Sequence, residues 1–251
     1  MEFEDILYEV RNGVAWITIN RPDKMNAFRG TTCDELIKAL NKAGYDKSIG
    51  AIVLAGAGEK AFCTGGDQSA HDGNYDGRGT IGLPMEEMHD AIRNVPKPVI
   101  ARVQGFAIGG GNVLCTICDL TICSEKAQFG QVGPKMGSVD PGYGTAFLAR
   151  VVGEKKAREI WYLNKRYSGQ EAVAMGLAFL RMQQERTQHG NHREGNEERP
   201  RHAHDGGDGD GRKQAALQAL QCEQRHEHEH DDERGVENGV SHFAGGAGDD
   251  F

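Results

Sequence analysis

Two glycine-rich segments contain the residue types from which a binding site for a negatively charged oxygen can be built. One is FCTGGDQ at residues 62–68, and the other is GGG at Gly109–Gly111, in front of an apolar run. A helix N-terminus without side chains offers an anion free N–H groups and the positive end of the helix dipole. N–H groups from both segments, aimed at one oxygen, would stabilise the charge that develops on a carbonyl. Each segment alone is equally explained by a tight turn that needs positive φ.

The three consecutive glycines do not fit the two common nucleotide-binding fingerprints. A dinucleotide site needs GxGxxG, and Leu114 stands three residues after Gly111, where the last glycine is required. A phosphate loop needs Gly-Lys followed by Ser or Thr, and the chain contains no such tripeptide. An oxyanion hole, formed by two segments that each follow a strand, is the interpretation that remains.

Hydrophobic patterning predicts strands that alternate with helices around these two segments. Asn12-Gly13 indicates a hairpin turn between strands over 5–10 and 14–19. Further strands are expected at 50–56, 98–105 and 119–124, and helices at 31–46, at 84–94, after the triple glycine, and twice within 144–163 with a break at Gly153. This alternation predicts an α/β fold with largely buried strands.

The chain of 251 residues changes in composition near residue 180. Residues 181–251 contain nine Lys/Arg and sixteen Asp/Glu, a net charge of −7 within the formal −8 of the whole chain. Eight of the ten histidines lie there, and isoleucine does not occur after Ile160. We therefore predict a core over 1–178 and a polar tail over 179–251 that does not match the fold. The tail is expected to be disordered or to arise from a shifted reading frame.

Charge and composition also exclude several classes of protein. Near neutrality over the first 180 residues argues against nucleic acid as a partner, and no apolar run approaches the length of a membrane span. The N-terminus lacks the features of a signal peptide, and six cysteines without one favour reduced thiols and a cytoplasmic location. Cys115 and Cys118 are interpreted as small buried residues. The alternating His and Glu at 226–230 would collect a metal only weakly, so no metal site is predicted.

Several blocks of sequence resemble, in order, the crotonase (enoyl-CoA hydratase/isomerase) superfamily. The blocks are RPDKMNAF (21–28), AFCTGGD (61–67), VQGFAIGGGNVL (103–114), CDLTICSEKAQFGQ (118–131) and GEKKAREIWY (153–162). The resemblance implies a crotonase-type spiral of ββα units and an acyl-CoA substrate. It also implies that the thioester oxygen lies between the backbone N–H groups of Gly66 and Gly110. Glycines at these positions would let the thioester approach the backbone closely.

The same resemblance implies where coenzyme A binds, as part of the substrate rather than as a permanently bound cofactor. The implied coenzyme A contacts are Lys24, Ala27, Thr64, Gly65, Asp67, Gln68, Gln131 and Gly133. Lys24 is equally explained as a solvated surface lysine. Family members form trimers or hexamers through a C-terminal segment, and residues after 178 do not match that segment. We therefore leave open a catalytically impaired chain that only binds coenzyme A.

Two positions distinguish this chain from the hydratases of the superfamily. Hydratases carry a glutamate two residues after the triple glycine and another two residues after Phe-Gly-Gln, and these positions are Val113 and Gly133 here. The segment GQVGPKMGSVDPGYG (130–144) resembles instead the dihydroxynaphthoyl-CoA synthase branch, in which Ser138 and Asp140 match motif residues. Gly133 matches a glycine at which some members of that branch hold bicarbonate as a base.

Within that branch the chain is most similar to the 2-ketocyclohexanecarboxyl-CoA hydrolases, which open a ring. The resemblance implies hydrolysis of a cyclic β-ketoacyl-CoA to an open-chain dicarboxylic monothioester such as pimeloyl-CoA, in the anaerobic degradation of benzoate. Asp140 is the candidate base and Ser138 the residue that orients it or the ketone. Asp140 is also explained as a turn residue before Pro141-Gly142. Ring closure of the synthase type stays as the alternative reaction.

Overall fold

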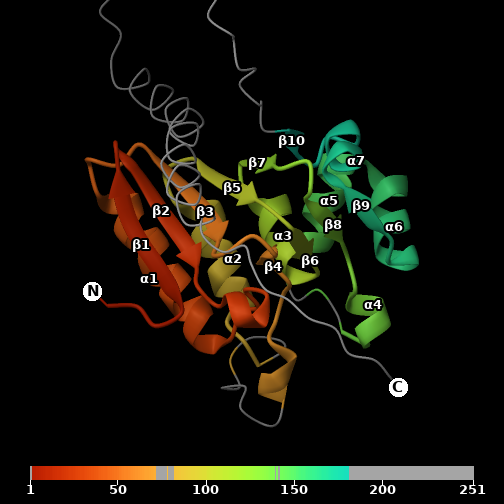
Figure 1. Ribbon diagram of the computed structural model, residues 1–251, viewed down its shortest axis with the longest axis horizontal. Helices are drawn as coiled ribbons and strands as arrows, with labels where there is room; N and C mark the ends of the chain where they lie inside the picture. The colour runs from red at the N-terminus through yellow and green to blue at the C-terminus, as the bar shows by residue number, and fades with distance from the viewer. Residues whose placement is uncertain (1, 72–77, 79–81, 139, 141, 181–251) are drawn as a thin grey trace, which may run out of the picture.

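The computed structural model describes residues 2–71, 78, 82–138, 140 and 142–180 (Figure 1). The predicted tail therefore lies outside the described residues from position 181 onward, and its nature stays a prediction. The described helices and strands confirm the predicted α/β fold. No helix among the described residues is long and apolar enough to cross a membrane.

The larger sheet contains the five strands that the sequence predicted and also β10, whose two residues were assigned to the tail but pair with β7. Its order is β1-β2-β3-β5-β7-β10, with β1 and β2 antiparallel and all other pairs parallel. The strands are β1 (Ile6–Arg11), β2 (Val14–Ile19), β3 (Ala51–Gly56), β5 (Val99–Val103), β7 (Leu120–Cys123) and β10 (Phe179–Leu180). Asn12 and Gly13 both have positive φ, 50° and 76°, as a two-residue hairpin turn requires. All six residues of β3 are buried, which fits a central parallel strand.

A second, smaller sheet has the order β4-β6-β8-β9, and the sequence did not predict it as a sheet. Its strands are β4 (Ala61–Cys63), β6 (Phe106–Ile108), β8 (Gln128–Gly130) and β9 (Arg166–Ser168). The predicted strand at 98–105 ends at Val103, because the chain turns at Gly105, whose φ is +59°. A Cβ at Gly105 would collide with the Lys60 carbonyl, so only glycine allows this turn between β5 and β6.

The helices agree with the predicted pattern at their main positions. The described helices are η1 (Pro22–Lys24), α1 (Gly30–Tyr45), η2 (Gln68–His71), α2 (Met85–Asn94), α3 (Gly110–Ile117), α4 (Gly133–Met136), α5 (Gly144–Val152), α6 (Glu154–Leu163) and α7 (Gly169–Ala174). Gly153, with φ +81°, separates α5 from α6 as expected. Three consecutive units, β3-β4-α2, β5-β6-α3 and β7-β8-α4, each place one strand in the larger sheet and one in the smaller sheet.

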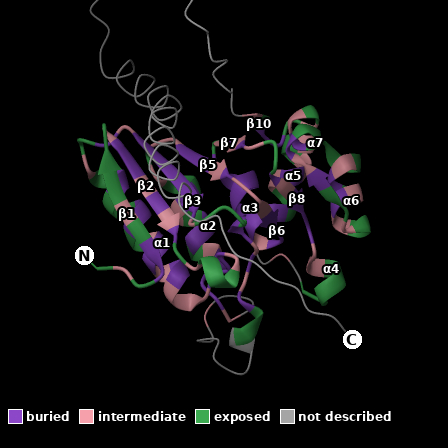
Figure 2. Cartoon of the chain, viewed as in Figure 1, coloured by how far each residue is buried: buried purple, intermediate pink, exposed green. Residues whose placement is uncertain are grey.

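The main hydrophobic core joins both sheets to the helices, and Figure 2 shows its buried residues along the inner strands and α3. On β2, Ala15, Ile17 and Ile19 belong to this core, whereas Val14 belongs to a smaller cluster on the opposite face of the larger sheet. The five described cysteines are buried and form no disulfide with one another, and burial was expected for Cys115 and Cys118. Burial raises the pKa of the Cys63 thiol to about 12, so this thiol stays protonated.

Candidate active site

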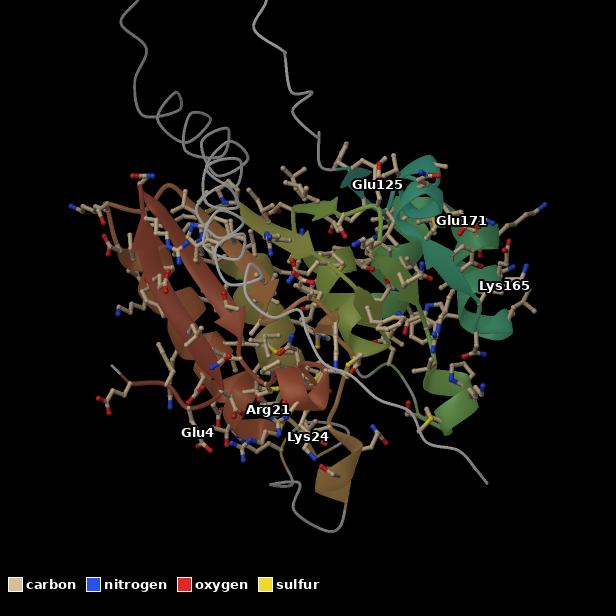
Figure 3. The ribbon with its side chains drawn as sticks, in the orientation of Figure 1. Glu4, Arg21, Lys24, Glu125, Lys165 and Glu171 are labelled. Atoms are coloured by element: carbon tan, nitrogen blue, oxygen red, sulfur yellow. The ribbon has the colours of Figure 1, made fainter. Side chains whose placement is uncertain are left out.

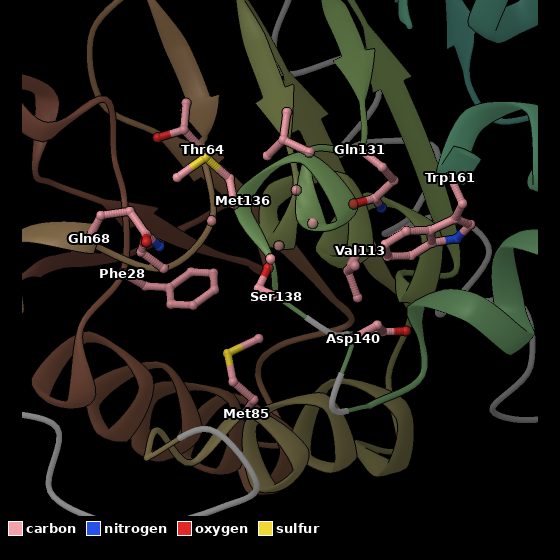
Figure 4. A pocket seen from close by; sticks show the side chains of 17 residues that line it. Phe28, Thr64, Gln68, Met85, Val113, Gln131, Met136, Ser138, Asp140 and Trp161 are labelled. Atoms are coloured by element: carbon pink, nitrogen blue, oxygen red, sulfur yellow. The ribbon is translucent and has the colours of Figure 1, made fainter. Parts of the chain in front are cut away.

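The three parallel strands of the smaller sheet bring the predicted site segments together. Strands β4, β6 and β8 run parallel, so their carboxyl ends meet at one edge of the sheet. Residues 64–66, 109–110 and 131–133 follow these ends directly, and all three segments line one cavity of about 520 Å³ (Figure 4). The convergence that the oxyanion interpretation requires is therefore present.

The three consecutive glycines serve three different purposes. Gly109 has φ +58° and ψ −121°, a backbone conformation that side chains rarely allow. A Cβ at Gly111 would collide with the carbonyl oxygen of Cys63, so Gly111 lets α3 pack directly against β4. Gly110 is the first residue of α3 and lines the cavity. Backbone conformation therefore requires glycine at Gly109, and close packing requires it at Gly111. Gly110 is the residue at which the helix begins beside the cavity.

Gly65 and Gly110 lie against each other. A Cβ at Gly65, where φ is +91°, would lie 2.9 Å from the Gly110 nitrogen, and a Cβ at Gly110 would lie 3.1 Å from the Gly65 Cα. Phe28 donates to the Gly65 carbonyl at 2.9 Å, and Asp67 donates to the Phe28 carbonyl at 2.8 Å. Among the described residues, neither the Gly66 nor the Gly110 N–H has a backbone acceptor. Gly66 and Gly110 both line the cavity, and their role as donors to an oxygen there stays a prediction.

The residues predicted to contact coenzyme A fall into two groups. Five of them line the cavity, namely Thr64, Gly65, Gln68, Gln131 and Gly133. Three do not line it, namely Lys24, Ala27 and Asp67. Lys24 is exposed at the end of η1, at the lower edge of the molecule in Figure 3, and Ala27 is buried with its carbonyl bound by the Arg21 guanidinium. Whether any of the eight contacts coenzyme A stays a prediction.

Asp67 is engaged within the protein. Its Oδ2 accepts from the Arg21 Nη2 at 2.8 Å, and its Oδ1 accepts from the backbone N–H and hydroxyl of Ser69. Burial, which raises the pKa of Asp67, is outweighed by these hydrogen bonds from Ser69 and Arg21, and the pKa lies below its usual value. Asp67 is therefore a charged partner of Arg21 directly beside Gly66.

Asp140 is the one carboxylate among the described residues that line the cavity. Its Oδ2 accepts from the backbone N–H and hydroxyl of Thr145, and its Oδ1 accepts from the Gly142 N–H at 3.3 Å. Asp140 thus stabilises the first turn of α5 and the 140–142 turn, while it also faces the cavity. Both interpretations that the sequence left open, the turn residue and the candidate base, are compatible with this position.

The sequence also singled out Ser138, as a residue that orients the base or the ketone, and Val113, which stands where hydratases carry a glutamate. Ser138 is exposed at the cavity, its N–H donates to the Gly133 carbonyl at 2.9 Å, and a Cβ at Gly133 would lie 3.5 Å from its hydroxyl. Val113 is buried beside Gly144, and a Cβ at Gly144 would lie 2.9 Å from the Asp140 Oδ2. Asp140 and Val113 are therefore neighbours across Gly144.

Sequence reasoning missed Trp161, which lines the cavity from α6. Its indole N–H has no hydrogen-bond partner, and neither has the side-chain NH₂ of the buried Gln131 on the same cavity wall. A Cβ at Gly133 would lie 3.4 Å from the Trp161 ring. The ring atom that lies near Gly133 is Cζ3, on the six-membered ring, whereas the indole nitrogen is buried, so the structure does not present this N–H beside Gly133. The helical spacing of Trp161 is typical of a core residue. That it lines the cavity depends on where α6 packs, which the spacing does not show.

His89 of α2 was also missed, and it lies behind this wall. The side chain is fully buried, both ring nitrogens lack partners, and a Cβ at Gly142 would collide with the ring. Burial lowers the pKa of His89 to about 4, although the negative charges of Asp140, Glu86 and Asp90 act to raise this pKa. The imidazole is therefore neutral near pH 7. The only sequence signal was a polar residue on the apolar face of the helix.

Comparisons with known proteins agree with this geometry. The chain matches the family model described as Enoyl-CoA hydratase/isomerase over residues 9–198, more than half of its length. An enoyl-CoA hydratase/carnithine racemase from Magnetospirillum magneticum is 29% identical, with a TM-score of 0.65 over 71% of this chain and 68% of that chain. A protein from Legionella pneumophila, described as an enoyl-CoA hydratase/isomerase (crotonase), is 29% identical, with a TM-score of 0.63 over 70% and 69%.

Proposed function

Since the chain belongs to the enoyl-CoA hydratase/isomerase family, we propose that it hydrolyses the ring of a cyclic β-ketoacyl-CoA such as 2-ketocyclohexanecarboxyl-CoA. One observation carries the proposal. The described cavity lining has Val113 and Gly133 where hydratases of the superfamily carry glutamates, and it has Asp140 as its one carboxylate. A site with one carboxylate does not supply the two acid–base groups used to add water across a double bond, whereas it suffices to activate water against a ketone.

The proposed reaction begins with the addition of water to the ring ketone. Asp140 takes a proton from the water, and the oxygen forms a bond to the ketone carbon. The bond between that carbon and the α-carbon of the thioester then breaks, and its electron pair passes into the thioester as an enolate. Protonation of the α-carbon gives the open-chain dicarboxylic monothioester, so the net change is the addition of one water molecule.

The charge of the enolate lies on the thioester oxygen. The N–H groups of Gly66 and Gly110 are the proposed donors to this oxygen, since both line the cavity and neither has a backbone acceptor among the described residues. Such donors act mainly on the state in which charge has developed, so they lower the barrier rather than only tighten binding. Ser138, exposed at the cavity beside Gly133, is the proposed residue that orients the ketone or Asp140.

Two further ligands follow from the family resemblance. Bicarbonate, where it is bound, would lie beside Gly133, where the Trp161 ring and Gln131 line the cavity, and would supply a base. The coenzyme A part of the substrate would pass Thr64 and Gln68, which line the cavity on the same side as Phe28 (Figure 4). The protein is proposed to act in the cytoplasm.

Incubation of the purified chain with 2-ketocyclohexanecarboxyl-CoA tests the proposal. The expected product is pimeloyl-CoA, heavier than the substrate by the mass of one water, detected by mass spectrometry. A parallel reaction with an open-chain precursor of dihydroxynaphthoyl-CoA tests ring closure. If only the second substrate reacts, the chain is a synthase. Binding of both substrates without turnover would show a protein that binds coenzyme A esters but is catalytically impaired.

A further inference from the structure

One guanidinium connects the two segments that approach the proposed oxyanion hole. Arg21 follows β2, and its side chain is 14% exposed. Its Nη1 donates to the carbonyl of Ala27, and its Nη2 donates to the carboxylate of Asp67 at 2.8 Å. Asp67 directly follows Gly66, and Ala27 directly precedes Phe28, the residue that bridges to Gly66. The Arg21 fork therefore holds both sides of the Phe28–Gly66 bridge.

The segment that carries Gly66 is also held by the two backbone hydrogen bonds of the Phe28–Gly66 bridge and by the packing of Gly65 against Gly110. Gly65 and Gly66 are both glycines, and Gly65 has φ +91°, so local side-chain sterics do not fix the direction of the Gly66 N–H. The bridge to Phe28 is isolated and belongs to neither sheet. An oxyanion donor must nevertheless be held within about 0.5 Å of its productive position. The partly buried ion pair of Arg21 with Asp67 restrains the residue that directly follows Gly66.

We propose that Arg21 is a positioning residue whose fork, on Asp67 and on the Ala27 carbonyl, fixes the Gly66 N–H toward the cavity. The inference rests on the proposed role of Gly66 as an oxyanion donor, but not on which ketone is cleaved. Arginine suits this role because its planar fork binds two acceptors in a defined direction, which a lysine cannot do. The Nε of Arg21 also lies 3.6 Å from the buried carboxylate of Asp5, and this ion pair further restrains the guanidinium.

The chain offers a matched control in Arg29. This arginine donates to Asp5 through both Nε and Nη2 at 2.8 Å, so it belongs to the same ion-pair network. Its ion-pair partners are Asp5 and Glu4, and neither lies in the 61–67 segment. Loss of Arg29 therefore weakens the network without releasing Asp67. A general effect of destabilisation would appear in both variants, and a positioning effect only in the Arg21 variant.

The experiment measures how strongly the protein polarises a bound thioester carbonyl. The probe is cyclohexanecarboxyl-CoA labelled with ¹³C at the thioester carbonyl, which has no ketone and is not cleaved. In the unmodified protein we expect a downfield shift of the bound carbonyl resonance. Arg21→Met and Asp67→Asn should each lose more than half of that displacement, and Arg21→Lys should retain part of it. Turnover of the ring substrate should fall about tenfold to a hundredfold in the first two variants.

Each outcome decides the proposal. A full displacement in folded Arg21→Met and Asp67→Asn overturns it, and so does an equal loss in Arg29→Met. If Arg21→Met does not fold, the near-isosteric Asp67→Asn and the charged Arg21→Lys give the answer. No displacement in the unmodified protein overturns both this inference and the oxyanion assignment. A displacement that depends on Arg21, without cleavage of the ring substrate, supports this inference and rejects the proposed ring hydrolysis.

Discussion

The two walls of the cavity are built in different ways, and the difference indicates which wall determines the reaction. Figure 4 shows Phe28, Thr64 and Gln68 on one side of the cavity and Gln131, Trp161 and Asp140 on the other. The wall of Gly65, Gly66 and Gly110, which we call the backbone wall, presents amides that are fixed by strand ends, close packing and the Arg21–Asp67 pair. The wall of Gln131, Asp140 and Trp161, which we call the side-chain wall, presents functional groups.

The backbone wall would receive a thioester oxygen whatever reaction follows, because its amide donors would contact only that oxygen and not the rest of the substrate. The side-chain wall contains the positions that differ from a hydratase, with Val113 and Gly133 in place of carboxylates. Enolate stabilisation is thus assigned to the first wall, and the choice between adding water, opening a ring and closing a ring to the second. The following predictions test this division.

The largest expected effect is on the side-chain wall, at Asp140. Asp140→Asn should lower kcat by about 10²–10⁴, the usual scale for a positioned base, with little change in the affinity for coenzyme A esters. Thr145→Val is the control, because it removes one hydrogen bond to Asp140 and leaves the carboxylate in place. A rate within tenfold of the unmodified protein would reduce Asp140 to its turn role. Restoration of the Asp140→Asn rate by bicarbonate would place the base beside Gly133.

On the backbone wall, Gly110→Pro should lower kcat by about 10²–10³, because proline removes one oxyanion donor. A Cβ at Gly110 would lie 2.7 Å from the Phe28 ring, so the substitution is made together with Phe28→Leu, which shortens that side chain. Gly110→Ala in the same background retains the N–H and is the matched control. Equal rates in the proline and alanine variants, both folded by circular dichroism, would remove Gly110 from the oxyanion hole.

A smaller effect is expected where Trp161 lines the side-chain wall beside Gly133. Trp161→Phe replaces the indole that packs at the proposed bicarbonate position with a smaller ring and should weaken the response of the rate to bicarbonate about tenfold, a change of about 1.4 kcal/mol in binding. Trp16→Phe is a suitable control, because the Trp16 indole N–H is also unpartnered but its residue does not line the cavity. The measurement is a bicarbonate titration of turnover. Identical titrations for both variants would contradict the proposed anion site.

The smallest effect on turnover is expected behind the side-chain wall, at His89, where stability should change instead. The folded-state pKa of about 4 lies below the ordinary value of 6.5, so the unfolded chain binds a proton first as the pH falls. The stability contribution is therefore complete above about pH 6.5 and is lost by about 1.4 kcal/mol per pH unit down to about pH 4. His89→Leu should remove this slope between pH 6.5 and 4 in urea unfolding. An unchanged slope would mean that His89 is protonated in the folded protein.

Much of the fold could be predicted from the sequence, and the reason is the length of the elements. The helix at 30–45 and the strands at 14–19 and 51–56 have enough residues to show a hydrophobic period, and Asn12-Gly13 and Gly153 mark where elements end. The two glycine-rich segments were found for a similar reason, because glycines in front of an apolar run are a local signal. The cavity that they line confirms that the segments meet.

Only the tertiary structure determined the smaller sheet and the groups that depend on it. Strands β4, β6, β8 and β9 have three residues each, too few for a period, and they exist because neighbouring units pair them. Their carboxyl ends nevertheless position all three segments of the site. The Arg21–Asp67 pair spans 46 positions and Trp161 reaches Gly133 from another helix, so no local pattern reveals either contact. The sequence by itself determined which backbone segments can approach an oxygen, whereas long-range packing decided which side chains face it.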